Sequence, residues 1–191
     1  MPSGKIWTIP NLITIFRILL TPGFVIAYLD SNFLAAWLLF MVAGFSDGLD
    51  GFLARVMKQR TEFGAMIDPL ADKILLVTSF ICLSAQGFIP VWLTVLVVSR
   101  DLIIVGGLFL LKFYGVEVEK RIQPLWTSKI TTALQLLVVF SVLTGLAFRL
   151  DVSFMSPAVE IVTAVFTFVS GSIYLRRGLV MFAEEVGDGA K

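Results

Sequence analysis

The sequence predicts an all-α, polytopic integral membrane protein with six transmembrane helices and a short N-terminal interfacial segment. The composition is the first reason, because 58% of the 191 residues are hydrophobic and only 15% are charged. The second is a mean hydropathy of +0.93, well above that of a soluble domain. The third is a series of apolar stretches, each near the ~20 residues that a helix needs to cross a bilayer. With no internal repeat or linker, residues 1–191 are expected to form a single membrane domain.

The predicted spans are separated by short polar breaks. The spans cover residues 9–29, 33–57, 63–84, 88–112, 126–148 and 155–175. The breaks read DSN after Leu29, KQRTE after Met57, SAQG after Leu83 and GVEVEKRIQP after Tyr114. Before the first span, residues 1–8 include Lys5 and Trp7, which suit the headgroup zone.

Lysine and arginine fall mainly on one side of the predicted bundle. Six spans place on that side Lys5, Lys58, Arg60, Lys120, Arg121, Arg176 and Arg177. The opposite side has mainly Arg149, so the positive-inside rule predicts that both termini are cytoplasmic.

The composition also excludes several kinds of chemistry. The chain has no histidine, which rules out histidine acid–base catalysis and histidine-ligated metals. Cys82 is the single cysteine, so no internal disulfide can form. A net charge of +1 without a basic run argues against nucleic acid as a partner. The amino terminus lacks the pattern of a removable signal peptide, so we expect the first apolar stretch to be retained.

Four aspartates stand out against the apolar background. Asp47 and Asp50 fall in the second predicted span, and Asp68 and Asp72 fall in the third. A charge inside the membrane costs roughly 2.5–3.5 kcal/mol or more. Spacings of three and four residues put each pair on one helical face. Because the two spans run antiparallel from a shared turn, we expect the two faces to meet in one polar pocket that opens to the cytoplasm.

Carboxylates without histidine or a usable cysteine favour a hard divalent cation such as Mg²⁺, Mn²⁺ or Ca²⁺. Two such ions can clamp a diphosphate and stabilise its leaving group. Alternatively, the acids pair with Arg55 and Lys73 and only hold the helices together. The cation is favoured because four acids outnumber these two bases.

A family resemblance rests on the same residues. The stretch DGLDGFLARVMKQRTEFGAMIDPLAD fits the pattern D-x2-D-G-x2-A-R-x8-G-x3-D-x3-D at every position. This pattern is the signature of the CDP-alcohol phosphotransferases, which the chain therefore resembles. The segment IPNLITIFRILLTP in the first span is also similar to the phosphatidyltransferase branch of that family.

The resemblance implies a reaction and a set of residue roles. Family members displace CMP from a CDP-linked lipid, here CDP-diacylglycerol, by attack of an acceptor alcohol, with Mg²⁺ or Mn²⁺ (two ions) as cofactor. The implied metal ligands are Asp47, Asp50, Asp68 and Asp72, with Asp72 also acting as the general base. The implied nucleotide site comprises Gly51, Ala54, Arg55 and Gly64, together with Asn11 and Thr14, for which capping or packing is an equal alternative. The resemblance also implies a homodimer in a bacterial inner (plasma) membrane, with a cytoplasmic active site.

Two branches of the family share these features and differ in the acceptor. The segments VSRDLIIVGGLFLL and PLWTSKITTALQLLVV resemble the cardiolipin synthases of the CMP-forming type, which use phosphatidylglycerol. The glycerophosphate branch has an acidic residue after the first arginine, as Asp101 is here, and a second arginine where this chain has Leu108. We therefore expect phosphatidylglycerol, with glycerol 3-phosphate as the alternative acceptor.

A basic wall for the acceptor phosphate is expected from Arg17, Arg100, Lys129 and Lys73, since arginine suits bidentate phosphate contacts. Arg100 and Asp101 can instead form an internal ion pair. Two other classes of protein remain as rivals. A transporter would need acids that are reachable from both sides of the membrane, whereas a structural scaffold would need no metal.

Overall fold

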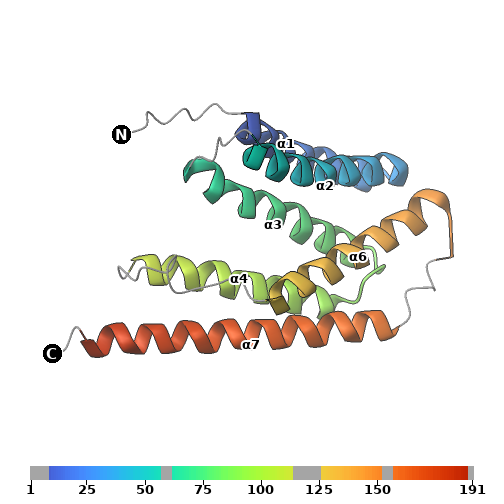
Figure 1. The fold of residues 1–191 in the computed structure, drawn as a ribbon. Helices are drawn as coiled ribbons and strands as arrows, with labels where there is room; N and C mark the ends of the chain where they lie inside the picture. Colours follow the sequence, from blue (N-terminus) through green and yellow to red (C-terminus); the bar gives the residue numbers. More distant parts are fainter. Residues whose placement is uncertain (1–8, 57–61, 114–125, 152–156, 189–191) are drawn as a thin grey trace. The chain divides into compact units, whose positions relative to one another are not determined.

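The protein is all-α in the computed structural model, which describes residues 9–56, 62–113, 126–151 and 157–188. For residues 9–11, 47–56, 62–70, 108–113, 157 and 182–188 the description covers the backbone alone. These ranges hold six helices (Figure 1): α1 Ile9–Leu29, α2 Phe33–Val56, α3 Glu62–Ala85, α4 Val91–Phe113, α6 Trp126–Phe148 and α7 Pro157–Asp188. The predicted fold class is confirmed.

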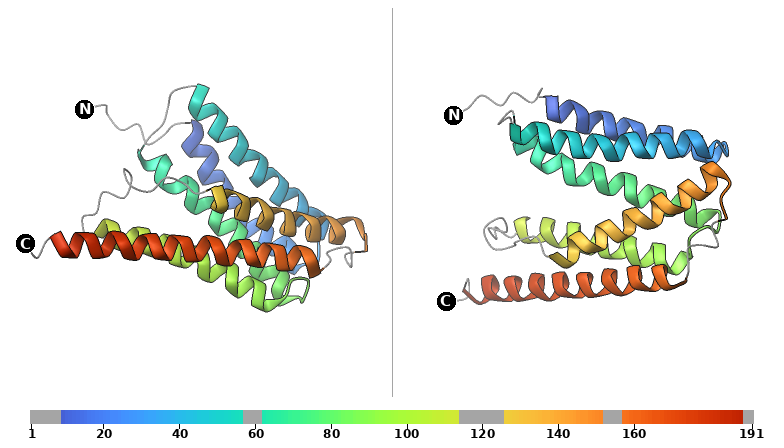
Figure 2. Two further views of the ribbon diagram at one scale, coloured as in Figure 1. Left: turned by 60° about the horizontal axis from the view of Figure 1, so that its bottom comes forward. Right: turned by 45° about the vertical axis from the view of Figure 1, so that its right-hand side comes forward.

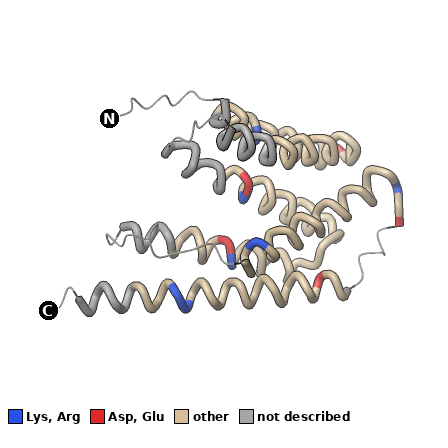
Figure 3. Tube along the Cα trace, in the orientation of Figure 1, with Lys and Arg blue, Asp and Glu red and all other residues tan. Residues whose placement is uncertain are grey.

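The helices have the apolar surface of an integral membrane protein. Within the described residues, three stretches are long and apolar enough to cross a bilayer: Leu12–Leu29, Trp126–Phe148 and Ala158–Met181. Large apolar side chains such as Leu19, Phe45 and Phe168 are more than half exposed, as expected for contact with lipid. Charged residues are sparse along the described helices (Figure 3).

Two of the predicted breaks are tight turns with capping bonds. In the DSN break, Asn32 caps α2, since its Oδ1 accepts a hydrogen bond from the backbone N–H of Ala35 at 3.2 Å. In the SAQG break, Gly87 has a φ of 79°, and its N–H donates to the carbonyl of Ser84 at 3.0 Å. This left-handed conformation suits glycine and ends α3.

Two helix bounds differ from the sequence prediction by three residues or more. α4 begins at Val91 and not at residue 88, because Gly87 and Pro90 hold the preceding residues in a turn. α7 continues to Asp188, well beyond residue 175. The prediction followed the apolar run, whereas the helix continues through the polar residues after it. The KQRTE and GVEVEKRIQP breaks and the interfacial segment 1–8 lie outside the described residues.

The helices group into two compact units, and α6 contributes to both. The first unit comprises residues 1–88 and 139–154, and the second comprises residues 89–138 and 155–191. The expectation of a single domain stays a prediction. In the first unit α1 packs against both α2 and α3 (Figure 2). The indole N–H of Trp37 on α2 donates to Thr144 Oγ1 at 2.9 Å, which ties in the end of α6. In the second unit α4 packs along α7.

One face of α1 forms the centre of the first unit. Its buried residues follow a helical repeat: Thr14, Arg17, Thr21, Phe24 and Tyr28. The first three are polar, whereas the last two are aromatic and stack with ring centroids 6.0 Å apart. The buried face of α1 is therefore polar toward its N-terminus and aromatic toward its C-terminus.

Candidate active site

The four aspartates lie on two helices that both pack against α1. Asp47 and Asp50 belong to the C-terminal part of α2, and Asp68 and Asp72 belong to the N-terminal part of α3. Helical backbone at these positions places each pair on one helical face, as the spacing predicted. The side chains of Asp47, Asp50 and Asp68 lie outside the described residues, as do those of Asn11, Gly51, Ala54, Arg55 and Gly64. That the two acidic faces meet therefore stays a prediction.

Asp72 is the aspartate of the four whose side chain is described, and it is paired with an arginine from α1. The guanidinium Nη1 of Arg17 donates to Asp72 Oδ1. Arg17 is only 1% exposed, whereas the side chain of Asp72 is 43% exposed. The ion pair therefore joins a fully buried cation to a carboxylate that still reaches the surface of the unit.

This pairing gives Arg17 a role that the sequence did not indicate. Arg17 was expected at the acceptor phosphate, but the two paired residues are 55 positions apart and no pattern connects them. Thr14 lies on the same buried face of α1, close to one turn before Arg17. Lys73 follows Asp72 on α3 and is partly exposed. The polar end of α1 is thus brought to the acidic part of α3.

The donor set fits a hard divalent cation. The four predicted ligands supply carboxylate oxygens alone, the type of ligand that Mg²⁺ and Mn²⁺ prefer. Arg17 offsets the charge of one of the four acids, so a surplus of negative charge remains on α2 and α3 unless cations bind. Within the described side chains there is no group of three metal-ligating residues, and three of the four predicted ligands lie outside that part of the chain.

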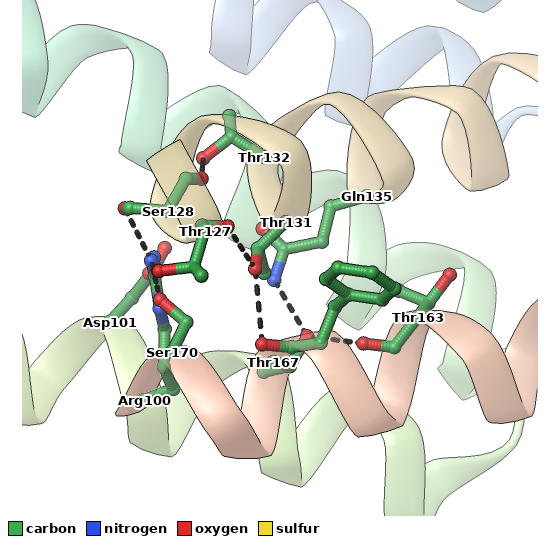
Figure 4. A network of polar contacts seen from close by, with 11 residues as sticks. Arg100, Asp101, Thr127, Ser128, Thr131, Thr132, Gln135, Thr163, Thr167 and Ser170 are labelled. Atoms are coloured by element: carbon green, nitrogen blue, oxygen red, sulfur yellow. Dashed lines mark hydrogen bonds and ion pairs between the residues drawn. The ribbon is translucent and has the colours of Figure 1, made fainter. Parts of the chain in front are cut away.

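The other predicted basic residues lie in the second unit, where a separate polar cluster surrounds Arg100 (Figure 4). Arg100 Nη1 donates to Asp101 Oδ1 at 2.5 Å, and both residues are at least 95% buried. Nη2 donates to Ser128 Oγ of α6 at 2.6 Å and to Ser170 Oγ of α7 at 2.9 Å. The ion pair between Arg100 and Asp101, which was the alternative prediction for Arg100, is therefore present.

Lys129 has a different environment from Arg100. It is exposed on α6, and its Nζ lies 5.3 Å from the centre of the Trp126 ring. Arg17 and Lys73 belong to the first unit and Arg100 and Lys129 to the second, so the basic wall stays a prediction. The sequence did not single out Ser128 and Ser170. An arginine inside an apolar helix needs several oxygen partners, so Arg100 itself indicated that such residues must exist.

An all-α membrane fold with paired aspartates on two successive helices defines a class of integral membrane proteins with a carboxylate site. Residues 7–169 match the CDP-alcohol phosphatidyltransferase family. The chain belongs to this family of enzymes.

Relatives of two kinds are similar to the chain. The rat cardiolipin synthase (CMP-forming) is 33% identical over 186 residues, which cover 90% of this chain and 62% of the rat protein. The CDP-diacylglycerol–glycerol-3-phosphate 3-phosphatidyltransferase of Sodalis glossinidius is 36% identical over 177 residues, which cover 87% of this chain and 92% of that protein. A probable phosphatidylglycerophosphate synthase of Mycobacterium tuberculosis is 31% identical over 182 residues, which cover 92% of this chain and 84% of that protein. The chain thus spans about 62% of the length of the rat and human relatives.

The Arg17–Asp72 pair can be tested by a double-mutant cycle on stability. Arg17→Met and Asp72→Asn each break the pair, so the double variant should lose less stability than the two single losses combined. The coupling should be about 1–3 kcal/mol, as for a hydrogen bond to a charged group. Unfolding of the detergent-purified protein measures it. As a control, Arg17→Met combined with Asp30→Asn should be additive, since Asp30 is exposed just after the end of α1, about 20 Å from Arg17 along the helix axis. Additive losses for Arg17 and Asp72 would contradict the pairing.

Proposed function

We propose that this protein transfers the phosphatidyl group of CDP-diacylglycerol to the hydroxyl of an acceptor alcohol and releases CMP. The observation that carries the proposal is the family match, together with the complete aspartate signature on α2 and α3. In this reaction the acceptor oxygen forms a bond to the phosphorus of the phosphatidyl group. The bond from that phosphorus to the CMP oxygen breaks, and CMP leaves with the electron pair.

Asp47, Asp50, Asp68 and Asp72 would hold the divalent cations, Mg²⁺ or Mn²⁺, as two ions. Such ions neutralise a diphosphate and stabilise the charge on the departing CMP. We assign Gly51, Ala54, Arg55 and Gly64 to the nucleotide, with Asn11 and Thr14 beside them. Residues without bulky side chains at three of these positions allow a ligand to approach the helix backbone.

Asp72 is our candidate for the general base. Its carboxylate is partly exposed and is held by the Arg17 guanidinium, so it can keep a fixed orientation while it accepts the proton of the acceptor hydroxyl. A positioned carboxylate at hydrogen-bond distance from that hydroxyl is what general-base catalysis requires. Arg17 would act as a positioning residue in this step.

For the acceptor we propose phosphatidylglycerol, as in the relatives named cardiolipin synthase (CMP-forming). One feature of α4 supports this choice: Leu108 occupies the place of the second arginine of the glycerophosphate branch. A free phosphate monoester carries close to two negative charges and needs more uncompensated positive charge than a phosphodiester with one. The alternative is glycerol 3-phosphate, as in the name of the Sodalis glossinidius relative, of which the chain covers 92%.

We further propose that the protein resides in a bacterial inner (plasma) membrane as a homodimer, with both termini and the active site in the cytoplasm. The excess of lysine and arginine on the side of the termini supports this orientation. A transporter or a scaffold would require no release of CMP, so the same assay that identifies the acceptor also separates these classes.

The acceptor prediction is tested with the purified protein, CDP-diacylglycerol and Mg²⁺ in detergent. CMP should be released when phosphatidylglycerol is added, with cardiolipin as the lipid product, and much less should be released with glycerol 3-phosphate. Chromatography of nucleotides and lipids measures both products. The reverse preference would overturn the proposed acceptor, whereas no CMP release with either acceptor would contradict the proposed activity.

The role of Asp72 predicts that Asp72→Asn lowers kcat by about 10²–10⁴-fold, the usual contribution of a positioned base. The amide has nearly the same shape but accepts no proton from the acceptor. A thermal unfolding curve shows whether the variant is folded. Asp30→Asn removes an exposed carboxylate from the same unit and should leave kcat unchanged. An Asp72→Asn enzyme that works at the wild-type rate would remove Asp72 from the mechanism.

A further inference from the structure

A ladder of buried polar side chains joins α6 to α7 in the second unit. Thr131 Oγ1 donates to the carbonyl of Phe166 at 3.1 Å, and Gln135 Nε2 donates to Thr167 Oγ1 at 3.3 Å (Figure 4). Thr131, Gln135 and Thr167 have no exposed surface. Hydrogen bonds in apolar surroundings resist exchange with water, so this ladder joins the two helices at these positions.

The end of the ladder contacts Arg100 of α4. Ser128 lies one turn before Thr131 on α6, and Ser170 lies one turn after Thr167 on α7. Both hydroxyl oxygens accept hydrogen bonds from the same guanidinium nitrogen, Nη2. The helices that the ladder holds together therefore fix one edge of the Arg100 guanidinium from two sides, while Asp101 holds Nη1.

A glycine beside Ser170 makes the close approach possible. A Cβ at Gly171 would lie 3.2 Å from Cγ of Arg100, a tight contact, so a larger residue would require the arginine side chain to shift by a few tenths of an ångström. Ser170 and Gly171 follow directly after residue 169, where the family match ends. Neither residue belongs to the segment that matches the family.

One donor of this arginine remains open. Arg100 is 4% exposed, and among the described residues its Nε has no hydrogen-bond acceptor. The Nε of Arg17 likewise has no acceptor among the described residues. Buried donors are normally satisfied, so an oxygen from a ligand would complete the hydrogen bonds of the fixed Arg100 guanidinium.

We propose that Ser128, Ser170 and Gly171 are positioning residues that orient Arg100 so that its Nε edge binds the phosphate of the acceptor lipid. This inference rests on the proposed function, because it assigns Arg100 to the acceptor. The three residues act through Arg100 and have no direct part in the chemistry. Their loss changes how well the acceptor binds and leaves the donor and the base unaffected.

Steady-state kinetics with CDP-diacylglycerol and phosphatidylglycerol tests the proposal on detergent-purified protein. Ser170→Ala removes one of the two oxygens on Nη2 and should raise KM for the acceptor about tenfold, which corresponds to about 1.4 kcal/mol. The kcat and the KM for CDP-diacylglycerol should stay within about twofold. Gly171→Ala should have the same effect with both serines present. Ser128→Ala removes the other oxygen and provides a further variant if Ser170→Ala does not fold.

Thr163→Val is the matched control. Thr163 lies two turns from Ser170 on the same helix and is equally buried, and its hydroxyl donates to the carbonyl of Val159 within α7. Its acceptor KM should stay within about twofold of the wild type. Equal increases for Ser170→Ala and Thr163→Val, or no increase for Ser170→Ala and Gly171→Ala, would overturn the positioning role while the wild type remains active. A wild-type protein that releases no CMP would overturn the proposed function as well, so the two failures are distinguishable.

Discussion

A buried charge in an apolar helix bundle needs an opposite charge beside it, and this constraint organises both units of the protein. In the first unit the buried Arg17 meets Asp72, and in the second the buried Arg100 meets Asp101. Removing one partner of such a pair leaves an uncompensated charge, which is far more costly than an exposed one. The sequence predicts a similar constraint for the four aspartates of α2 and α3, because they fall within predicted spans. Arg17 offsets one of them, and bound divalent cations are the simplest way to offset the others.

The helix α1 shows how the fold supplies this compensation. A single buried face carries Thr14, Arg17 and Thr21 and then Phe24 and Tyr28. The polar part supplies Arg17 to the acidic part of α3, whereas the aromatic part packs with its neighbours. Phe24, for example, lies with its ring centroid 6.3 Å from that of Phe40 on α2. One helix face thus combines electrostatic compensation at one end with apolar packing at the other.

Much of the helix pattern could be predicted from the sequence, because apolar runs and polar breaks report directly on membrane crossing. α1 and α6 have the predicted bounds, while the polar end of α7 was missed because it is helical without being apolar. The aspartates could be found from their spacing. The Arg17–Asp72 pair and the serines around Arg100 could not, because they depend on how distant helices rotate against each other. The meeting of the two acidic faces stays a prediction, since three of the four side chains lie outside the described residues.

We propose that the membrane tolerates the acidic residues of α2 and α3 because they bind divalent cations beside a diphosphate. Titration of the purified protein with Mn²⁺, followed by electron paramagnetic resonance with CDP-diacylglycerol present, measures this directly. We expect about two bound ions per chain, as in a two-metal site, and reduced binding in Asp68→Asn. A wild-type protein that binds no Mn²⁺ with all four aspartates intact would contradict it.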